Sequence, residues 1–259
     1  MIAGNWKMHL NVQQSSLLAQ RLNERIKVHR DIEVVLAPSL LSLQPLSLEI
    51  DRRKFRLAAQ NAHFKDEGAY TGEVSFTMLH DLVHYVIVGH SERRIYFNET
   101  LEVVRDKVAA AFRNGIAPIL CVGENKEERK DGMTRRVLHD QIVTALYNLT
   151  ADEVVATVIA YEPVWAISTF GGELAKPAQI HEAINFIRRQ IAELYGEHVA
   201  TEVRILYGGS VDDQVARGYL EVEGCDGALV GGASINYAKF TGIVDAAYRM
   251  LLEMNNRNV

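Results

Sequence analysis

The chain has 259 residues, of which 48% are hydrophobic and 24% charged, a composition typical of a folded globular protein. The formal net charge is −5 and no long basic run occurs, so the sequence gives no support to nucleic-acid binding. The longest uncharged apolar segments have the length of a strand, which argues against a transmembrane helix.

Short apolar segments recur along the chain, and segments with helical periodicity lie between them. Each apolar segment has the length and composition of a buried strand. With a short stub at the N-terminus counted as the first, we expect strands at residues 2–3, 33–37, 56–59, 85–88, 117–121, 158–161, 204–207 and 227–230.

The segments between these strands carry signals of helix ends. Asn11 and Gln14 have the spacing of a capping box. Asn98 is expected to cap the helix that follows it. Pro177 is expected to open a long helix that closes at Gly196.

Strands and helices alternate without a polar linker, which predicts a parallel sheet covered on both faces. Eight such units in about 250 residues match a closed (β/α)8 barrel. An open doubly wound sheet is the alternative. It would need a Gly-x-Gly-x-x-Gly turn after the first strand, and residues 4–7 read Gly-Asn-Trp-Lys. We therefore predict an α/β protein with one closed barrel domain over residues 1–259.

In such a barrel, chemistry takes place at the carboxyl ends of the strands. Polar residues and glycines occupy that end of strand after strand in this sequence. They are Asn5 and Lys7, Gln60 and Asn61, His90, Glu124, Glu162, residues 208–210 and residues 231–234. Because chance would scatter such residues, we expect them to surround one site.

Glu162 and His90 would converge on this site from different strands. Pro163 disfavours helix at Glu162, so the carboxylate would stand at the end of its strand. A carboxylate and an imidazole across a small cavity suit proton transfer, because one can take a C–H proton while the other polarises a carbonyl. A helix beginning at Ser91 would favour a neutral ring at His90. Taken alone, each residue would more often have a structural role.

Lys7 and a glycine pair would handle negative charge. Lys7 would supply a positive charge where negative charge develops, although a salt bridge to a neighbouring acid explains it equally well. Gly231 and Gly232, together with Ser210, would present N–H and hydroxyl groups to a phosphate. A glycine pair also serves as a tight turn.

Other chemistries find less support in the sequence. No His, Cys or Asp cluster has the spacing of metal ligands, and Ser91 lies in no Gly-x-Ser-x-Gly motif. The fold can also host flavin and pyridoxal enzymes. Proton chemistry on a phosphorylated carbonyl compound needs no cofactor, so we predict neither a metal nor a cofactor.

The cysteines and the N-terminus bear on the cellular location. Cys121 and Cys225 both lie in apolar segments and are expected to be reduced core residues. The few residues before Gly4 leave no room for a signal peptide. We therefore expect a cytoplasmic protein.

The motifs at the strand ends resemble those of the triosephosphate isomerase family, from Gly4 to the last helix. The shared motifs are GNWKM at 4–8, QN at 60–61, GAYTGE at 68–73, VGHSERR at 88–94, CVGE at 121–124, AYEPVWAI at 160–167, YGGSV at 207–211 and VGGAS at 230–234. The resemblance is specific because the motifs occur in the family's order. It implies interconversion of dihydroxyacetone phosphate and glyceraldehyde 3-phosphate, a step of glycolysis and gluconeogenesis, through an enediolate.

The resemblance also implies a role for each catalytic residue. Glu162 would move the proton between two carbons, and a neutral His90 would donate or shuttle protons at the oxygens. Lys7 would balance the charge, while Asn5 would help to hold the substrate and the lysine. Glu92 would orient its neighbours without touching the substrate.

Phosphate binding and dimerisation are implied in the same way. The phosphate would rest on backbone N–H groups of Ser168, Gly231 and Gly232 and on Ser210. Members of the family are homodimers in which residues 65–75 of one subunit reach the other's site near Asn5 and Lys7. Thr71 would lie closest to the partner, beside an exposed Tyr70 that fits insertion into a pocket.

Two segments depart from the family pattern. Three residues precede Gly4 where the family usually has several, which predicts a short first strand and some loss of barrel closure. The lid at 166–176 has Ser168 and Phe170 where the family has glycines, and about two extra residues before Pro177. If the closed lid needs a positive φ at Ser168, the serine costs about 1 kcal/mol.

The altered lid leaves two alternatives open. One is a related isomerase for a tetrulose phosphate, with a pocket enlarged for a longer sugar. The other is a catalytically silent protein that binds a phosphorylated ligand under a lid that no longer closes. The presence of Glu162, His90 and Lys7 weighs against the silent binder, because a binder needs no base facing an electrophile.

Overall fold

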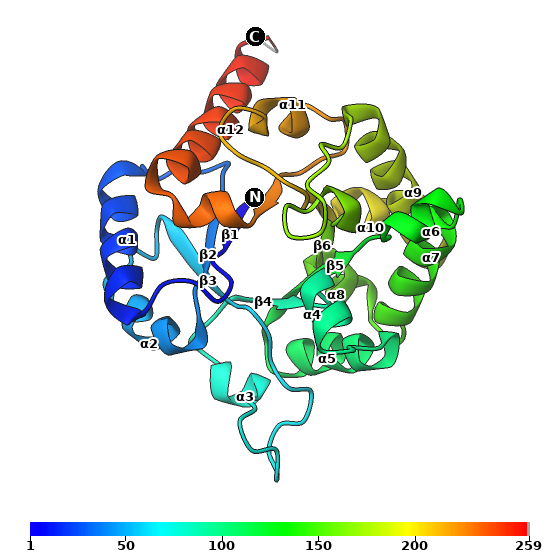
Figure 1. Ribbon diagram of the computed structural model, residues 1–259, viewed down its shortest axis with the longest axis horizontal. Coiled ribbons are helices and arrows are strands. Elements are labelled where there is room, and N and C mark those ends of the chain that lie inside the picture. The colour runs from blue at the N-terminus through cyan, green and yellow to red at the C-terminus, as the bar shows by residue number, and fades with distance from the viewer. Residues whose placement is uncertain (258–259) are drawn as a thin grey trace.

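In a computed structural model that describes residues 1–257, the protein folds as a closed barrel of eight parallel strands (Figure 1). Each strand pairs with the next one in sequence, and β1 also pairs with β8. The predicted closed barrel is confirmed, and the open sheet is wrong. The strands are β1 (Ile2–Asn5), β2 (Val34–Ala37), β3 (Phe55–Ala59), β4 (Tyr85–Val88), β5 (Ala117–Val122), β6 (Val158–Tyr161), β7 (Arg204–Tyr207) and β8 (Ala228–Val230).

The first strand is longer than the stub predicted at residues 2–3. β1 runs from Ile2 to Asn5, and all four residues are buried. Ile2 lies opposite Val34 on one side and Ala228 on the other. The expected loss of barrel closure is therefore wrong, because β1 forms a parallel ladder with both of its neighbours.

Helices surround the barrel and fill the connections between strands (Figure 1). No helix within residues 1–257 is both long and apolar enough to cross a bilayer. The α-helices of the described chain are α1 (Val12–Arg25), α2 (Leu40–Glu49), α3 (Phe76–Leu79), α4 (Ser91–Tyr96), α5 (Leu101–Arg113), α6 (Lys126–Lys130), α7 (Thr134–Ala145), α8 (Ala151–Ala156), α9 (Pro177–Tyr195), α10 (Glu197–Glu202), α11 (Ala216–Leu220) and α12 (Tyr237–Arg257). Two 3-10 turns, η1 (Val164–Ala166) and η2 (Gly232–Ile235), follow β6 and β8.

Helix ends agree with the sequence signals in all but one case. The capping box at Asn11 is present, and α9 begins at Pro177 and ends at Gly196. The prediction for Asn98 is wrong, because Thr100 caps α5 and accepts a hydrogen bond from the Val103 N–H. Asn98 has a φ of 53° and forms the turn before the cap, a backbone conformation that asparagine tolerates better than most residues.

Side chains fill the interior of the barrel. Ala3, Val35, Ile119, Leu206 and Leu229 belong to this inner cluster, and all are buried. A second and larger cluster lies between the strands and the helices. Both faces of the strands are therefore buried, which explains why the strands are continuous apolar runs in the sequence.

The two cysteines lie in different environments, and neither forms a disulfide. Cys121 is buried in β5, as predicted. Cys225 lies in the turn before β8 and is partly exposed, with its thiol 3.2 Å from the carbonyl oxygen of Gly227. The predicted core position is therefore wrong for Cys225, because β8 begins only at Ala228 and Cys225 lies in the connection before it.

The connection between β3 and α3 projects away from the barrel (Figure 1). Residues 65–73 are all exposed. The ring of His63 stacks on Phe64 with centroids 4.6 Å apart and lies 4.4 Å from the Tyr70 ring. The His63 N–H also donates to the carbonyl oxygen of Val74 at 2.8 Å. These contacts within the loop give the projection a defined shape.

Candidate active site

A cavity of about 350 Å³ opens at the carboxyl ends of the strands. Most of the residues predicted to form the site line it, although they come from strand ends spread over more than 200 residues of sequence. They are Asn5, Lys7, His90, Glu162, Ser168, Ser210, Gly231 and Gly232. Glu92 lines an adjoining cavity of about 450 Å³, which shares Asn5, Lys7 and His90 with the first.

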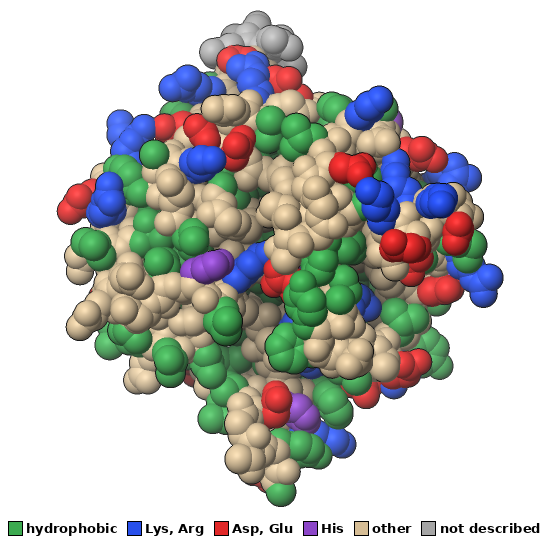
Figure 2. Space-filling model, viewed as in Figure 1, with side chains coloured by type: hydrophobic (Ala, Val, Ile, Leu, Met, Phe, Trp, Pro, Cys, Tyr) green, Lys and Arg blue, Asp and Glu red, His purple; other side chains and the backbone are tan. Residues whose placement is uncertain are grey.

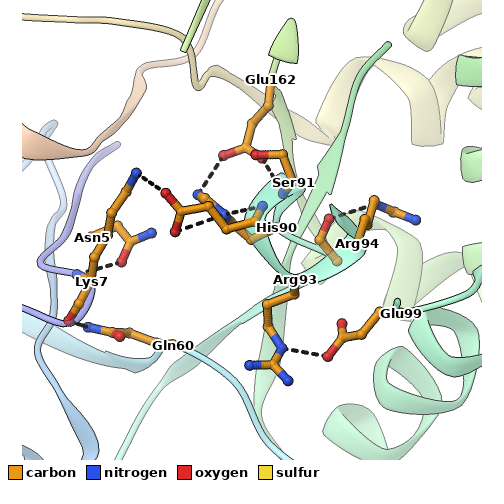
Figure 3. A network of polar contacts seen from close by, with 11 residues as sticks. Asn5, Lys7, Gln60, His90, Ser91, Arg93, Arg94, Glu99 and Glu162 are labelled. Atoms are coloured by element: carbon orange, nitrogen blue, oxygen red, sulfur yellow. Dashed lines mark hydrogen bonds and ion pairs between the residues drawn. The ribbon is translucent and has the colours of Figure 1, made fainter. Parts of the chain in front are cut away.

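Glu162 directly follows β6 and is only 2% exposed. One carboxylate oxygen accepts a hydrogen bond from the Ser91 backbone N–H at 3.2 Å, and the other lies 3.1 Å from Nε2 of His90 (Figure 3). Two glycines leave room for this arrangement. A Cβ at Gly208 would approach the Glu162 Cγ to 2.7 Å, and a Cβ at Gly123 would meet its carbonyl oxygen at 1.8 Å.

His90 is the N-cap residue of α4, and this position determines which nitrogen carries its proton. The Glu92 backbone N–H donates to Nδ1 at 3.2 Å, so Nδ1 must be unprotonated. Nε2 then carries the proton and donates it toward Glu162. The ring is therefore the neutral Nε2–H tautomer, assigned from its hydrogen-bond partners, and its N–H group faces the cavity.

Lys7 has a strained backbone that two amide side chains hold in place. Its φ is 52°, which is unusual for a residue other than glycine. The Lys7 N–H donates to Oδ1 of Asn5 at 3.1 Å, and Nε2 of Gln60 donates to the Lys7 carbonyl oxygen at 2.8 Å. The Lys7 ammonium lies 2.5 Å from Oε1 of Glu92, so Glu92 contacts the lysine through its carboxylate and the histidine through its backbone N–H.

Cys121 is fully buried close to Glu162. Burial raises the pKa of its thiol well above the usual range, and the neighbouring charge of Glu162 raises it further. The Arg94 guanidinium donates to the Cys121 carbonyl oxygen at 3.0 Å. Cys121 is therefore a neutral thiol at neutral pH and adds no second anion next to Glu162.

The groups predicted to bind phosphate line the same cavity. Ser210 follows β7, and both its hydroxyl and its N–H donate to the carbonyl oxygen of Ala166, at 2.8 and 3.1 Å. Gly231 follows β8 and lies beside Lys7, and η2 begins at Gly232. Ser168 lines the cavity from the lid.

Besides the Ser210 contact at Ala166, the lid rests on two neighbouring helices. The Phe170 ring lies 5.7 Å from the ring of Tyr96 in α4, and Glu173 forms a 2.7 Å ion pair with Lys126 in α6. Ser168 is exposed and has a negative φ, whereas the tight turn uses positive φ values at Gly171 and Gly172. In this conformation the serine therefore costs no backbone strain.

A buried polar network supports the start of the lid. The Trp165 indole N–H donates to Glu124 at 2.9 Å, and the Tyr161 hydroxyl lies 3.2 Å from the same carboxylate. The Arg129 guanidinium forms a 3.2 Å ion pair with Glu124 and lies 4.2 Å from the centroid of the Trp165 ring. Burial, and then the charge of Glu124, raises the pKa of Tyr161, so its hydroxyl remains a donor.

A larger cavity of about 1070 Å³ lies at the opposite end of the barrel. Met1, Glu33 and Arg204 are in its wall, together with part of α12, but it contains none of the predicted site residues. Glu33 and Arg204 are already paired at 2.7 Å. We assign the site to the smaller cavity, because it contains the acid–base groups and lies where barrel enzymes carry their chemistry.

The remaining predicted residues lie outside this cavity. Thr71 and Tyr70 are exposed at the tip of the projecting loop, and Tyr70 is 44% exposed. Within the described residues, no group of three His, Cys, Asp or Glu side chains is arranged to hold a metal ion.

Sequence reasoning missed several residues that support the site. Gln60 and Glu124 were identified at strand ends but were given no role, and Trp165 and Arg129 were not connected with the lid. The sequence signal for Glu124 is an acidic residue that follows an apolar strand and a glycine. Nothing in the sequence indicated that Arg129, five residues further on, would pair with it.

Comparisons with known proteins agree with this geometry. The family model described as Triosephosphate isomerase matches residues 1–247. Triosephosphate isomerase of Clostridium botulinum is 45% identical over 246 residues, which are 95% of this chain and 98% of the relative. The protein of the same name from Carboxydothermus hydrogenoformans is 44% identical over 244 residues, 94% of this chain and 96% of its own length. The chain therefore belongs to the triosephosphate isomerase family.

Proposed function

We propose that the chain is a triosephosphate isomerase that interconverts dihydroxyacetone phosphate and D-glyceraldehyde 3-phosphate. One observation carries the proposal: the residues predicted to transfer protons and those predicted to bind phosphate line the same cavity. A small phosphorylated carbonyl compound needs both, because its phosphate must be held while a proton moves at the adjacent carbons.

Glu162 acts as the base. Its carboxylate takes the proton from the carbon next to the carbonyl group, and the two C–O groups with the carbons between them become an enediolate. The same carboxylate, now protonated, returns the proton to the neighbouring carbon. The 3.1 Å distance between the Glu162 carboxylate and Nε2 of His90 supports this pairing of a base with a proton donor.

His90 and Lys7 act on the oxygens. Nε2–H of His90 donates to the carbonyl oxygen and transfers protons between the two oxygens as the enediolate forms and decays. The Lys7 ammonium stabilises the negative charge that develops there. Asn5 holds the Lys7 backbone and contacts the substrate, and Glu92 fixes the positions of Lys7 and His90.

The phosphate binds on the backbone N–H groups of Ser168, Gly231 and Gly232 and on Ser210. Because Ser168 belongs to the lid, phosphate binding and lid closure are coupled. Closure excludes water from the enediolate, which would otherwise lose its phosphate.

The proposal includes the absence of a cofactor and a cytoplasmic location. The groups present at the cavity suffice for proton transfer. The location is supported by the two free cysteines, which suit a reducing compartment.

We also propose that the protein is a homodimer that inserts residues 65–75 into the partner. The loop projects away from the barrel (Figure 1), and Thr71 and Tyr70 are exposed in it. The adjoining cavity, lined by Lys7, Met8 and Phe97, would receive it. Met8 is 97% exposed and Phe97 63% exposed in a single chain, and the partner's loop would cover them.

Sedimentation velocity tests the dimer. The wild type should sediment as a dimer, and Thr71→Arg should shift it toward the monomer, because the much larger side chain would not fit the cavity and would bring a further cation to a wall that already holds Lys7 and Arg93. Thr201→Arg, which adds the same charge on exposed α10, should leave the dimer intact. A monomeric wild type would contradict the proposal.

A coupled assay with glyceraldehyde 3-phosphate tests the activity. Turnover should need no added cofactor and should survive a chelator. The ratio of kcat/KM for triose and tetrose phosphates distinguishes this enzyme from a tetrulose-phosphate isomerase, for which the tetrose would be preferred. Binding of 2-phosphoglycolate by a folded protein without turnover would instead identify a silent binder.

A further inference from the structure

Two lysines line the candidate active site, and the mechanism above uses only one of them. Of the described residues around the cavity, the cationic ones are Lys7 and Lys239 and the anionic ones are Glu162 and Asp212. The Lys7 ammonium is already paired with Glu92 at 2.5 Å. The protein as a whole carries a formal charge of −5. A doubly charged phosphate ester that approaches the cavity therefore meets little uncompensated positive charge except at Lys239.

Lys239 lines the cavity from the first turn of α12, and its neighbour Asp212 lies two residues after Ser210 in the chain. Its backbone N–H donates to the side chain of Asn236 at 3.0 Å, which fixes the start of the helix. The side chain is 49% exposed, so its ammonium reaches both the cavity and the solvent. Lys239 is therefore at the rim, next to the groups proposed to receive the phosphate.

Lys239 is held only loosely in this position. Its ammonium lies 3.7 Å from Oδ2 of Asp212, beyond hydrogen-bond distance, and it makes no hydrogen bond to any other described residue. Asp212 is anchored independently, because its Oδ1 accepts from the backbone N–H groups of Gln214 and Val215 at 3.0 and 3.3 Å. The long, flexible lysine side chain can therefore leave Asp212 without disturbing the turn.

We propose that Lys239 captures the phosphate of the incoming substrate, moving from Asp212 toward the dianion before the lid closes. This inference rests on the proposed function. An exposed positive charge at the rim attracts an anion that has come within the electrostatic screening length of the solution. This attraction raises the association rate of the substrate. Asp212 opposes this attraction, because it partly neutralises the lysine and repels the phosphate. Lys239 is thus a substrate-binding residue that affects kcat/KM and leaves the proton transfer at Glu162 unchanged.

Steady-state kinetics of Lys239→Gln test the proposal. At low ionic strength kcat/KM should fall about fivefold, the effect expected for one charge acting on a dianion at about 8 Å in water. The value of kcat should remain within about twofold. In about 1 M salt, where the screening length is about 3 Å, the difference from wild type should disappear. Lys239→Arg should retain the wild-type behaviour.

Two further variants sharpen the test. Lys27→Gln removes the same charge from an exposed position between α1 and β2, outside the cavity lining, and should change kcat/KM little. Asp212→Asn keeps an oxygen to cap the turn but removes the opposing charge, so kcat/KM should rise at low salt.

The results separate the two proposals. If wild type turns over triose phosphate but Lys239→Gln behaves like Lys27→Gln, the role of Lys239 is wrong and the function stands. A loss that persists in high salt, together with a lower kcat, would show that Lys239 supports the start of α12 and would also overturn the capture role. A wild type without turnover would contradict the function itself.

Discussion

Glu162 rests in a hydrogen-bonded position that defines its environment before substrate arrives. The Ser91 N–H and the His90 Nε2–H both contact its carboxylate. To act as the proposed base, the carboxylate would turn from the Ser91 N–H toward the substrate. In the proposed mechanism it thus exchanges a hydrogen bond within the protein for the substrate proton.

Glu162→Gln should lower kcat by about 10³-fold or more, because general acid–base groups contribute about 10²–10⁴ and an amide cannot take a proton. The amide oxygen can still accept from the Ser91 N–H, so the fold should be unchanged. Circular dichroism and the affinity for 2-phosphoglycolate provide the controls. Activity within tenfold of wild type would show that another group is the base.

The protonation of His90 is directly measurable. With the Glu92 N–H donating to Nδ1, nitrogen-15 NMR of the ring at neutral pH should show a protonated Nε2 and an unprotonated Nδ1. His9, two residues after Lys7 in the chain, is exposed and supplies a reference for free tautomer exchange. Two protonated ring nitrogens at His90 would contradict the neutral donor.

At the residue scale, the sequence predicted which side chains line the site better than it predicted their backbone conformations. Glu162, His90 and Lys7 could be found because barrel topology brings strand ends together, and the structure places all three on one cavity. Their roles remain predictions. The positive φ of Lys7 and the clamp by Gln60 could not be foreseen, because they depend on contacts between strands that local sequence does not encode.

Among the elements, the lid is held by contacts that its unusual sequence creates. Phe170 packs on Tyr96, and Glu173 pairs with Lys126, while Ser168 remains exposed. Hydrophobic side chains gather over α4 on the face shown in Figure 2, where Ile95, Tyr96 and Phe97 are exposed. The ring of Phe170 extends this apolar surface and stabilises this position of the lid.

Phe170→Ala should tighten the binding of 2-phosphoglycolate by up to about tenfold. An aromatic pair contributes about 0.5–1.5 kcal/mol, and if closure over the ligand breaks this contact, the contact opposes closure by that amount. Calorimetry measures the dissociation constant. Thr169→Ala, at the neighbouring exposed position, is the matched control. Weaker binding by Phe170→Ala would mean that the ring moves with the lid onto the ligand.

Element boundaries were predicted where the signal is local. The capping box at Asn11 and the limits of α9 need only neighbouring residues and were confirmed. Asn98 was misassigned because asparagine suits both a cap and a left-handed turn, and Thr100 two residues later decided between them. The conformation of the lid could not be predicted, since its anchors on α4 and α6 lie far away in sequence.

For the molecule as a whole, repetition made the fold predictable. Eight apolar runs with helices between them leave few topologies other than a closed barrel, and the family comparison agrees. The extent of β1 was underestimated because Asn5, a polar residue, continues the ladder opposite Ala37. The assignment of residues 1–259 to one domain stays a prediction, and residues 258–259 lie outside the described part of the chain.

The buried ion pairs of Glu99 should make the free energy of unfolding depend on pH in the acid range. The Glu99 carboxylate is 5% exposed and accepts hydrogen bonds from Lys107 and from Arg93. Burial alone would raise the pKa of Glu99, but Lys107 and then Arg93 outweigh it and lower the pKa. A carboxyl group with a lowered pKa in the folded state stabilises the protein above its unfolded pKa of about 4.3, and this contribution is lost as the pH falls through the folded value.

Glu99→Gln should therefore cost about 3 kcal/mol of unfolding free energy at pH 7, because the buried Lys107 loses its charge partner. The difference from wild type should shrink as the pH is lowered below about 4.3. Urea unfolding across this range measures it. Asp140→Asn removes an exposed carboxylate paired with Arg136 and should change stability little. A difference that is constant with pH would show that the charge of Glu99 is not responsible.

The network at Trp165 has a practical consequence. The chain contains two tryptophans, and Trp6 is fully buried. Trp165 sits at the base of the lid, with its indole N–H on Glu124 and the Arg129 guanidinium over its ring. Nearby charges shift the wavelength of indole fluorescence. A rearrangement of the lid that alters these contacts therefore changes the emission of Trp165, while the emission of the buried Trp6 stays constant. Trp165 is thus an intrinsic fluorescence probe of lid position, and stopped-flow fluorescence can measure the rate of lid motion without an attached dye.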